Sequence, residues 1–238
     1  MTGSAVISLF LLLMTGLVLA FCQAQLISLI AQIRRIRRAP VGNVSLLPAT
    51  GSAALDGSAH GATLTSPFTG VPCVFWNIEI QEYRSTGRSG SWRIILNRSS
   101  DAPLLLDDGT GRVQVDPSGA TLTLFDRWST QQRFFGSLNR ATLDTLEHLN
   151  VKTRTWLGTN RVLRIYERHI RDGERVFVLG TLARVGEQSV LISAPKTPLL
   201  LSDRDRATLK QHLSIRALGL ISLPVLLLLL LVAINMFA

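Results

Sequence analysis

The two ends of this 238-residue chain carry no charged residue, and that absence constrains its fold more than any other feature. Residues 1–33 and 217–238 contain no Asp, Glu, Lys or Arg and are rich in Leu, Ile, Val and Ala. Because about 20 apolar residues cross the hydrocarbon core of a bilayer, each end can form a transmembrane helix. What remains between them is enough chain for one folded domain.

A basic cluster follows the first apolar segment directly. A cleaved signal peptide needs positive charge before its apolar core, and residues 1–4 have none, so we expect an uncleaved anchor. Basic residues beside a membrane helix favour the cytoplasmic side. The membrane-flanking residues are Arg34, Arg35, Arg37 and Arg38.

The charges beside the second apolar segment give the same orientation. Arg206, Lys210 and Arg216 precede it, and no charge follows it. We therefore predict a two-pass integral membrane protein with its domain in the cytoplasm and both termini outside; a periplasmic domain is the alternative. The net charge of +9 is then partly a membrane-flanking signal, and it is weak evidence for nucleic-acid binding.

Composition divides the chain into five segments. Residues 39–65 are rich in Ala, Gly and Ser and are typical of a linker with one short strand at most. The predicted division is a transmembrane anchor at 1–33, a basic flank and linker at 34–65, a β-rich domain at 66–201, a juxtamembrane helix at 202–216 and a transmembrane helix at 217–238.

Alternating apolar residues predict mostly strands in the domain. Residues 73–84 and 92–97 are expected to form an antiparallel hairpin, and residues 138–149 a helix with Asn139 as its N-cap. Further strands are expected within 103–117 on either side of an Asp-Gly turn, and at 120–125, 161–171, 175–183 and 188–194. The predicted fold is mostly β, a small barrel or sandwich (OB-like possible) with one or two helices.

Three motifs in this order resemble the GIDE domain, also called the BAM ("beside a membrane") domain, over residues 64–202. The first is a turn entering a strand, the second a tight turn between two strands, and the third a strand pair. Their residues are Ser66, Pro67, Gly70 and Cys73; then Asp108, Gly109, Gly111, Asp116 and Pro117; then Glu167, Gly173 and Gly180.

The resemblance implies a membrane-anchored protein related to E3 ubiquitin or SUMO ligases of mitochondria and chloroplasts. In those proteins a RING finger after the second helix performs the transfer. A RING needs about eight Cys or His ligands for two zinc ions, whereas this chain has two Cys and four His. The sequence is similar instead to RING-less prokaryotic relatives, so we do not expect an enzyme.

Chemistry at individual residues is not favoured. No two histidines have the spacing of metal ligands, and Cys73 is expected to be an inert core cysteine. The four tryptophans are expected at the core or its rim, and the motif glycines at turns or close backbone contacts. We therefore predict no catalytic residue, no metal and no cofactor.

The predicted function is a non-catalytic scaffold or membrane-organising module. A domain tethered at both ends is held close to membrane-bound partners, so we expect the lipid bilayer and a membrane-associated protein as partners. One alternative is E3 ubiquitin transfer inherited from the family, disfavoured without a RING. The other is an OB-like barrel that binds single-stranded nucleic acid, disfavoured because its arginines are interleaved with acidic residues.

Overall fold

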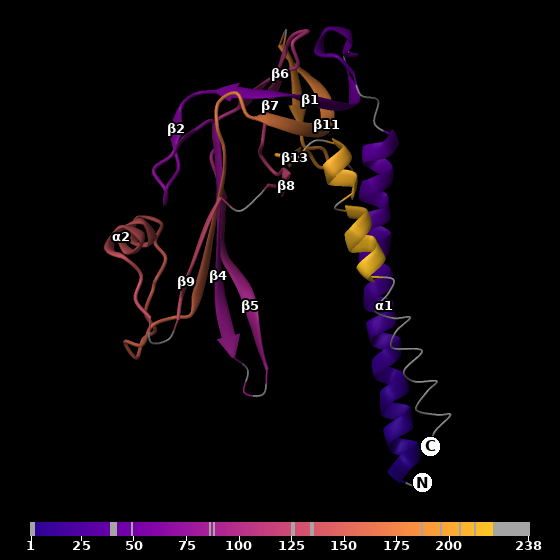
Figure 1. Cartoon of the computed structure of the whole chain (residues 1–238), viewed down its shortest axis with the longest axis vertical. Coiled ribbons are helices and arrows are strands. Elements are labelled where there is room, and N and C mark those ends of the chain that lie inside the picture. Colours follow the sequence, from indigo (N-terminus) through magenta and orange to yellow (C-terminus); the bar gives the residue numbers. More distant parts are fainter. Residues whose placement is uncertain are drawn as a thin grey trace. The chain divides into compact units, whose positions relative to one another are not determined.

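The computed structural model describes residues 3–38, 42–48, 50–85, 87, 89–124, 127–133, 136–186, 188–195, 197–204, 206–211 and 213–220. The chain divides into two compact units. One combines Met1–Ala39 with Arg206–Ala238, and the other is the domain, Pro40–Asp205. Figure 1 labels their elements.

Five strands of the domain close into a barrel. In ring order they are β1 (Gly51–Gly61), β6 (Leu104–Asp107), β7 (Arg112–Val115), β12 (Gln188–Ile192) and β11 (Arg175–Val185). The ring closes because β1 pairs with β11 along its first part and with β6 along its last. The β7–β12 pair is parallel, as in an OB-type barrel. The predicted mostly β class and barrel are confirmed.

Two short strands extend the barrel sheet, and a short helix precedes it. Strand β13 (Leu200–Ser202) pairs with β11, and β8 (Thr121–Thr123) pairs in parallel with β13. Val44 of the 3₁₀ helix η1 (Val44–Leu46) and Leu47, which follows it, pack against the barrel core.

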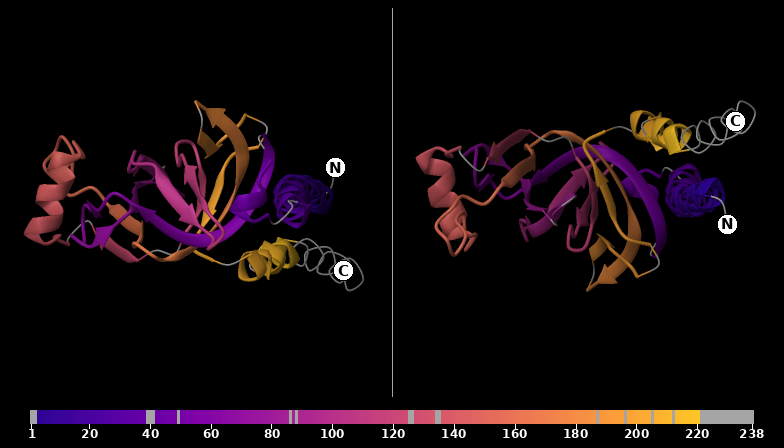
Figure 2. Two further views of the ribbon diagram at one scale, coloured as in Figure 1. Left: turned by 90° about the horizontal axis from the view of Figure 1, so that it is seen from above. Right: turned by 90° about the horizontal axis from the view of Figure 1, so that it is seen from below.

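A second sheet projects from the barrel. Its order is β5 (Gly90–Ser99), β4 (Phe75–Ser85), β10 (Leu163–Ile170) and β9 (Trp128–Gln132). Helix α2 (Arg140–His148) covers one face and lies at the end of the domain away from β11 and β12 (Figures 1 and 2). A hairpin of β2 (Leu64–Thr65) and β3 (Pro72–Cys73) leads into β4.

The same two strands, β4 and β10, contribute to both hydrophobic clusters. Phe75 and Ile170 belong to the cluster inside the barrel. Ile80 and Ile165, further along the same strands, pack with Leu146 of α2 in the second cluster. As predicted, Asn139 caps α2, because its Oδ1 accepts the Thr142 N–H at 2.8 Å.

Three segments differ from the prediction. Residues 51–61 form β1 rather than a linker, and its small side chains suit a strand in close contact with two neighbours. Strand β9 was not predicted, because its sequence Ser-Thr-Gln-Gln lacks alternating apolar residues. Its position at the edge of the sheet tolerates such a polar sequence. Ser202 lies in β13 rather than opening a helix; its Oγ bonds the Thr123 carbonyl and the Arg204 N–H, and helical residues begin at Arg206.

In the unit formed by Met1–Ala39 and Arg206–Ala238, the described residues include one long helix, α1 (Gly3–Arg38). Its segment Gly16–Arg37 is long and apolar enough to span a bilayer, with a mean hydropathy of 1.8. The Arg206 guanidinium donates to the carbonyls of Ile36 and Arg37, which a helix end leaves without intrahelical partners. Residues 213–220 are helical, and residues 221–238, which hold most of the second predicted span, lie outside the described residues.

Glu82 on β4 gives the domain a defined acid sensitivity. Its carboxylate accepts from Arg161 Nε at 2.6 Å and Arg84 Nε at 2.9 Å. The hydrogen bond from Arg161, opposed by burial and assisted by Arg84, lowers the pKa of Glu82 from about 4.5 to about 2. A carboxyl group whose pKa is lower in the folded state contributes its full stabilisation of the fold above its unfolded-state pKa. This stabilisation is lost as the pH falls through its folded-state pKa.

Glu82→Gln is therefore expected to flatten the loss of stability between about pH 4.5 and pH 2. The measurement is the urea midpoint of the full chain across this pH range, followed by tryptophan fluorescence. Asp144→Asn, at an exposed position of α2, is the control. An identical acid response in wild type and Glu82→Gln would contradict the assignment.

Candidate functional site

The turn at residues 66–70 is held to β10 by one buried carboxylate. Glu167 Oε2 accepts the Phe68 N–H at 2.6 Å, and its Oε1 accepts the Thr69 hydroxyl at 2.5 Å. Ser66 Oγ lies 2.6 Å from Thr69 Oγ1 and accepts the Val71 N–H. The result is a chain of hydrogen bonds that runs from the turn backbone through two hydroxyls to the carboxylate.

The surroundings of Glu167 are buried. Glu167 itself is 0% exposed, and His169, two residues along β10, is 4% exposed. His169 Nδ1 lies 3.8 Å from Glu167 Oε1 and has no hydrogen-bond partner. Burial lowers the pKa of His169, although the Glu167 charge opposes this. The imidazole is therefore held mainly in its neutral form at neutral pH.

Cys73 belongs to the same region but is a poor nucleophile. Burial raises the pKa of its thiol, and the negative charge of Glu167 raises it further, against a smaller opposite effect from the Phe75 backbone N–H. Because the thiolate is the reactive form, these surroundings suppress nucleophilic chemistry. The cluster of Ser66, Thr69, Cys73, Glu167 and His169 can hold a turn, and it offers no activated nucleophile.

The second motif forms a separate turn at the end of the barrel. Asp108 Oδ1 accepts the N–H groups of Thr110 and Gly111, at 2.8 and 3.1 Å. Its Oδ2 accepts the Val44 N–H at 2.7 Å and so attaches η1 to the turn. Burial would raise the pKa of Asp108, but these hydrogen bonds lower it overall. Asp108 therefore acts as a structural clamp.

The remaining motif residues lie in turns or tight strand contacts. Gly70, Gly109 and Gly173 have φ values of +66°, +83° and +76°, which favour glycine. A Cβ on Gly180 would lie 2.6 Å from Leu199 Cδ1, and one on Gly111 3.1 Å from Val44 Cγ1. Asp116 accepts the Ser118 N–H, Pro117 accepts the Ala120 N–H, and Pro67 lies in the 66–70 turn.

The basic residues predicted to flank the membrane occupy the last turns of α1. Arg34 and Arg37 are exposed, Arg35 is half-buried, and the Arg38 side chain lies outside what is described. Among the described residues, no group of three His, Cys, Asp or Glu side chains is arranged to hold a metal ion.

A groove of about 440 Å³ on the barrel bears on the nucleic-acid alternative. It lies over β6, β7 and β12, and its lining includes Arg112 and Gln114. Arg112 Nε already pairs with Asp107 at 2.8 Å, and none of the described lining residues is aromatic. Single-stranded nucleic acid is usually bound by free cations and stacking aromatics, so the groove gives this alternative no support.

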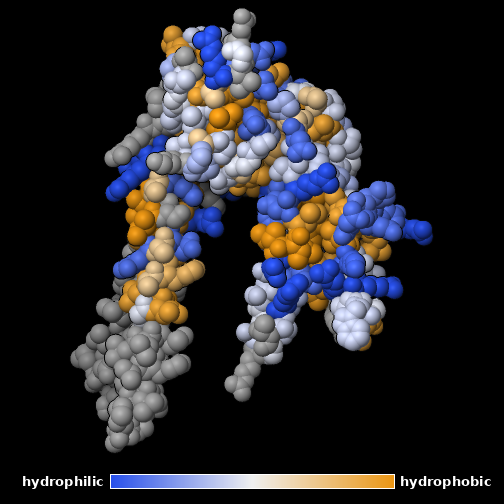
Figure 3. Space-filling view, turned by 180° about the vertical axis from the view of Figure 1, so that it is seen from behind, coloured by the Kyte–Doolittle hydropathy of each residue, from blue (hydrophilic) through white to orange (hydrophobic). Residues whose placement is uncertain are grey.

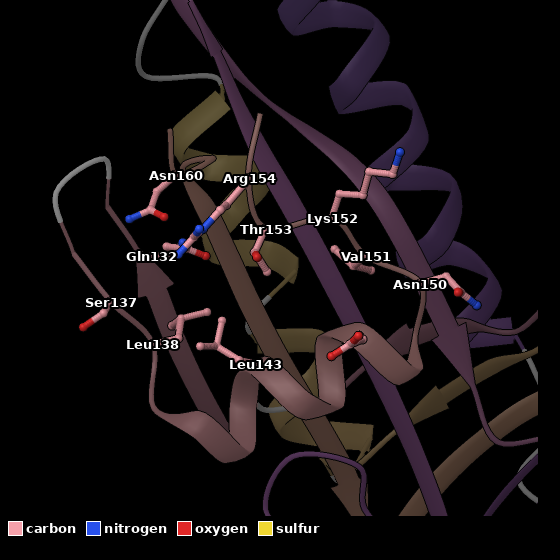
Figure 4. Close-up of a pocket in the computed structure, with 11 residues that line it drawn as sticks. Gln132, Ser137, Leu138, Leu143, Asn150, Val151, Lys152, Thr153, Arg154 and Asn160 are labelled. Carbon is pink, nitrogen blue, oxygen red and sulfur yellow. The ribbon is translucent and has the colours of Figure 1, made fainter. Parts of the chain in front are cut away.

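A cleft of about 540 Å³ lies beside α2 (Figure 4). Leu138, Leu143 and Val151 form its apolar part. Gln132, Arg154 and Asn160 project into one corner of it. Gln132 is 3% exposed and its Oε1 has no hydrogen-bond partner.

The sequence did not predict this cleft. Its residues come from the end of β9, from α2 and from the segments on either side of α2, and no motif joins these stretches. An available signal was the density of polar and basic residues at 150–160 next to Trp156 and Leu157. On the face shown in Figure 3, hydrophobic side chains gather below the barrel and are bordered by hydrophilic ones.

Comparison with known proteins gives one match. The model of the GIDE family, described as E3 ubiquitin ligase, matches residues 77–233. No curated protein and no solved structure matches the chain. The matched residues take in most of β4, the strands β5 to β13 with Glu167 and His169, and the segment that follows the domain; Ser66, Thr69 and Cys73 precede them. The match covers well over half of the chain, which therefore belongs to the GIDE family of E3 ubiquitin ligase-related proteins.

Proposed function

We propose that the protein is a membrane-anchored, non-catalytic scaffold whose GIDE domain recruits a membrane-associated protein partner. Helix α1 supplies one anchor, and the apolar segment at 217–238 supplies the second. The arginines at the end of α1 favour a cytoplasmic domain with both termini outside. In this role the domain contributes to ligase-related processes by binding, and transfer chemistry belongs to other proteins.

One observation carries the proposal. The Glu167 carboxylate and the hydroxyls of Ser66 and Thr69 are engaged in the hydrogen bonds that hold the 66–70 turn to β10, and Glu167 and Ser66 are buried. The raised pKa of the Cys73 thiol works against acyl transfer through that sulfur. The accessible features are instead a cleft and a surface that combines apolar and charged side chains, which suit binding.

The proposal predicts a partner that depends on the folded domain. Full-length protein is crosslinked in native membranes and purified under denaturing conditions, and its bound proteins are quantified by mass spectrometry. The matched control is Gly57→Ala, which keeps both anchors and disturbs the barrel through a backbone clash. We expect membrane-associated proteins enriched at least tenfold with wild type; equal recovery with the control would overturn the scaffold role.

The ligase alternative has its own test. The purified chain is mixed with a ubiquitin-conjugating enzyme loaded with ubiquitin, and release of ubiquitin is followed with time. We expect no acceleration over the conjugating enzyme alone. Acceleration that disappears in Cys73→Ser would instead establish transferase activity at that thiol.

A further inference from the structure

The turn at residues 155–159 exposes two large apolar side chains. Trp156 is 92% exposed and Leu157 is 67% exposed. The four tryptophans were expected at the core or its rim, and Trp156 is at neither. An exposed tryptophan adjacent to an exposed leucine is typical of surfaces that meet another molecule or a membrane.

The turn is rigidly built. The Thr155 N–H bonds the Thr159 carbonyl at 2.8 Å, and the hydroxyls of these two threonines lie 2.7 Å apart. Arg154 and Asn160 form a β-bridge at its base. The base is tied to the sheet, because Arg161 bonds Glu82 and donates to the Lys152 carbonyl at 2.8 Å. The exposed side chains are thus presented on a fixed support.

Polar groups adjoin this apolar tip. Lys152 and Arg154 are exposed, and both line the cleft beside α2. Among the described lining residues, only Glu147 is acidic. Gln132 Oε1, buried and without a partner, can accept a hydrogen bond from a hydroxyl or ammonium group.

We propose that the 155–159 turn and the adjoining cleft form a docking site for anionic phospholipid. Trp156 and Leu157 enter the membrane interface, Lys152 and Arg154 pair with headgroup phosphates, and Gln132 accepts a hydrogen bond from a headgroup donor. The inference rests on the proposed membrane anchoring and assigns the contact surface within it.

Three features favour a lipid surface over a protein partner. Tryptophan is enriched at membrane interfaces, where its ring lies at the level of the headgroups. Each basic residue near an anionic leaflet adds favourable interaction. The membrane anchor also keeps a bilayer close to the domain at all times.

The test uses the distribution of tryptophan in the chain. All four tryptophans (Trp76, Trp92, Trp128 and Trp156) lie in the domain, so any quenching of their emission by lipid reports contact of the domain with the bilayer. The full chain is placed in nanodiscs whose phospholipids carry bromine on the acyl chain near the headgroup. The lipid is either phosphatidylglycerol, which is anionic and has hydroxyl donors, or phosphatidylcholine, which has neither feature.

We expect quenching at least twofold stronger in phosphatidylglycerol than in phosphatidylcholine. Trp156→Phe should remove most of the quenchable emission. Trp92→Phe should keep the quenchable emission, because Arg164 covers the Trp92 ring. The Arg164 Cζ atom lies 3.8 Å from the centroid of that ring. Equal quenching in wild type and Trp156→Phe, or none in either, would overturn the tip as the contact.

The charge contribution has a matched pair of variants. Lys152→Glu combined with Arg154→Glu should reduce the difference between the two lipids at least threefold, whereas Arg140→Glu, also exposed but on α2, should leave it unchanged. A difference unaffected by the double variant would overturn headgroup pairing. If the double variant leaves the lipid difference unaffected while wild type still crosslinks its protein partner, scaffolding stands and lipid docking fails; if wild type crosslinks no partner, it is the scaffold role that fails.

Discussion

Glu167→Ala is expected to lower the free energy of unfolding of the domain by about 2–5 kcal/mol, because each buried donor left without an acceptor costs about 1–3 kcal/mol. The change leaves the Phe68 N–H without its acceptor and leaves the Thr69 hydroxyl with Ser66 Oγ as its partner. It also creates a cavity at a position that is 0% exposed. The measurement is guanidinium unfolding of the full chain, followed by tryptophan fluorescence.

Two variants at Thr69 separate the hydrogen bond from packing. Thr69→Ser keeps the hydroxyl that donates to Glu167, and we expect a loss below about 1 kcal/mol. Thr69→Val keeps the shape but leaves Glu167 Oε1 without this donor, so it should cost more than serine. If both variants unfold at the same denaturant concentration, the hydroxyl is not what holds the turn.

Gly57→Ala is expected to disrupt the barrel, with a loss of about 3 kcal/mol or more. A Cβ at this position would lie 2.5 Å from the Asp107 carbonyl oxygen and 2.9 Å from its carbon. These are backbone atoms of β6, so no side-chain rotation can relieve the contact. Gly57 lies where β1 passes from pairing with β11 to pairing with β6.

Gly61→Ala is the matched control on the same strand. A Cβ there would meet the Pro103 carbonyl oxygen at 3.4 Å, an ordinary contact. We expect its denaturation midpoint to stay within about 1 kcal/mol of wild type. Equal losses in the two variants would mean that glycine is needed for general strand flexibility and not for close approach of β1 to β6.

The parts of the fold that could be predicted are those marked by the pattern of apolar residues or by turn and capping residues. Strand β4 alternates apolar with polar residues, β11 is an apolar run that follows an Asp-Gly turn, and Asn139 marks the start of α2. Strand β1 could not be predicted in this way, because Ala53, Ala54 and Gly57 bury little apolar surface each. Its place depends on partners more than 100 residues away in β11.

The candidate sites were predictable to different degrees. Motif spacing singled out Ser66, Cys73 and Glu167, and the fold brings these together. Spacing could not reveal that Thr69 links Ser66 to Glu167, since this depends on the register of β10. The exposure of Trp156 was equally hidden, because tryptophan is normally well buried and a sequence does not show which loop projects.

The sharing of β4 and β10 between the two hydrophobic clusters has a mechanical consequence. Separating β4 from β10 would remove packing from both clusters, because Phe75 and Ile170 belong to one and Ile80 and Ile165 to the other. The domain should therefore melt as one cooperative unit. Strain applied at the Trp156 turn would pass through Arg161 and Glu82 into β4 and from there into the barrel. A load on the exposed turn would therefore reach the barrel core along this route.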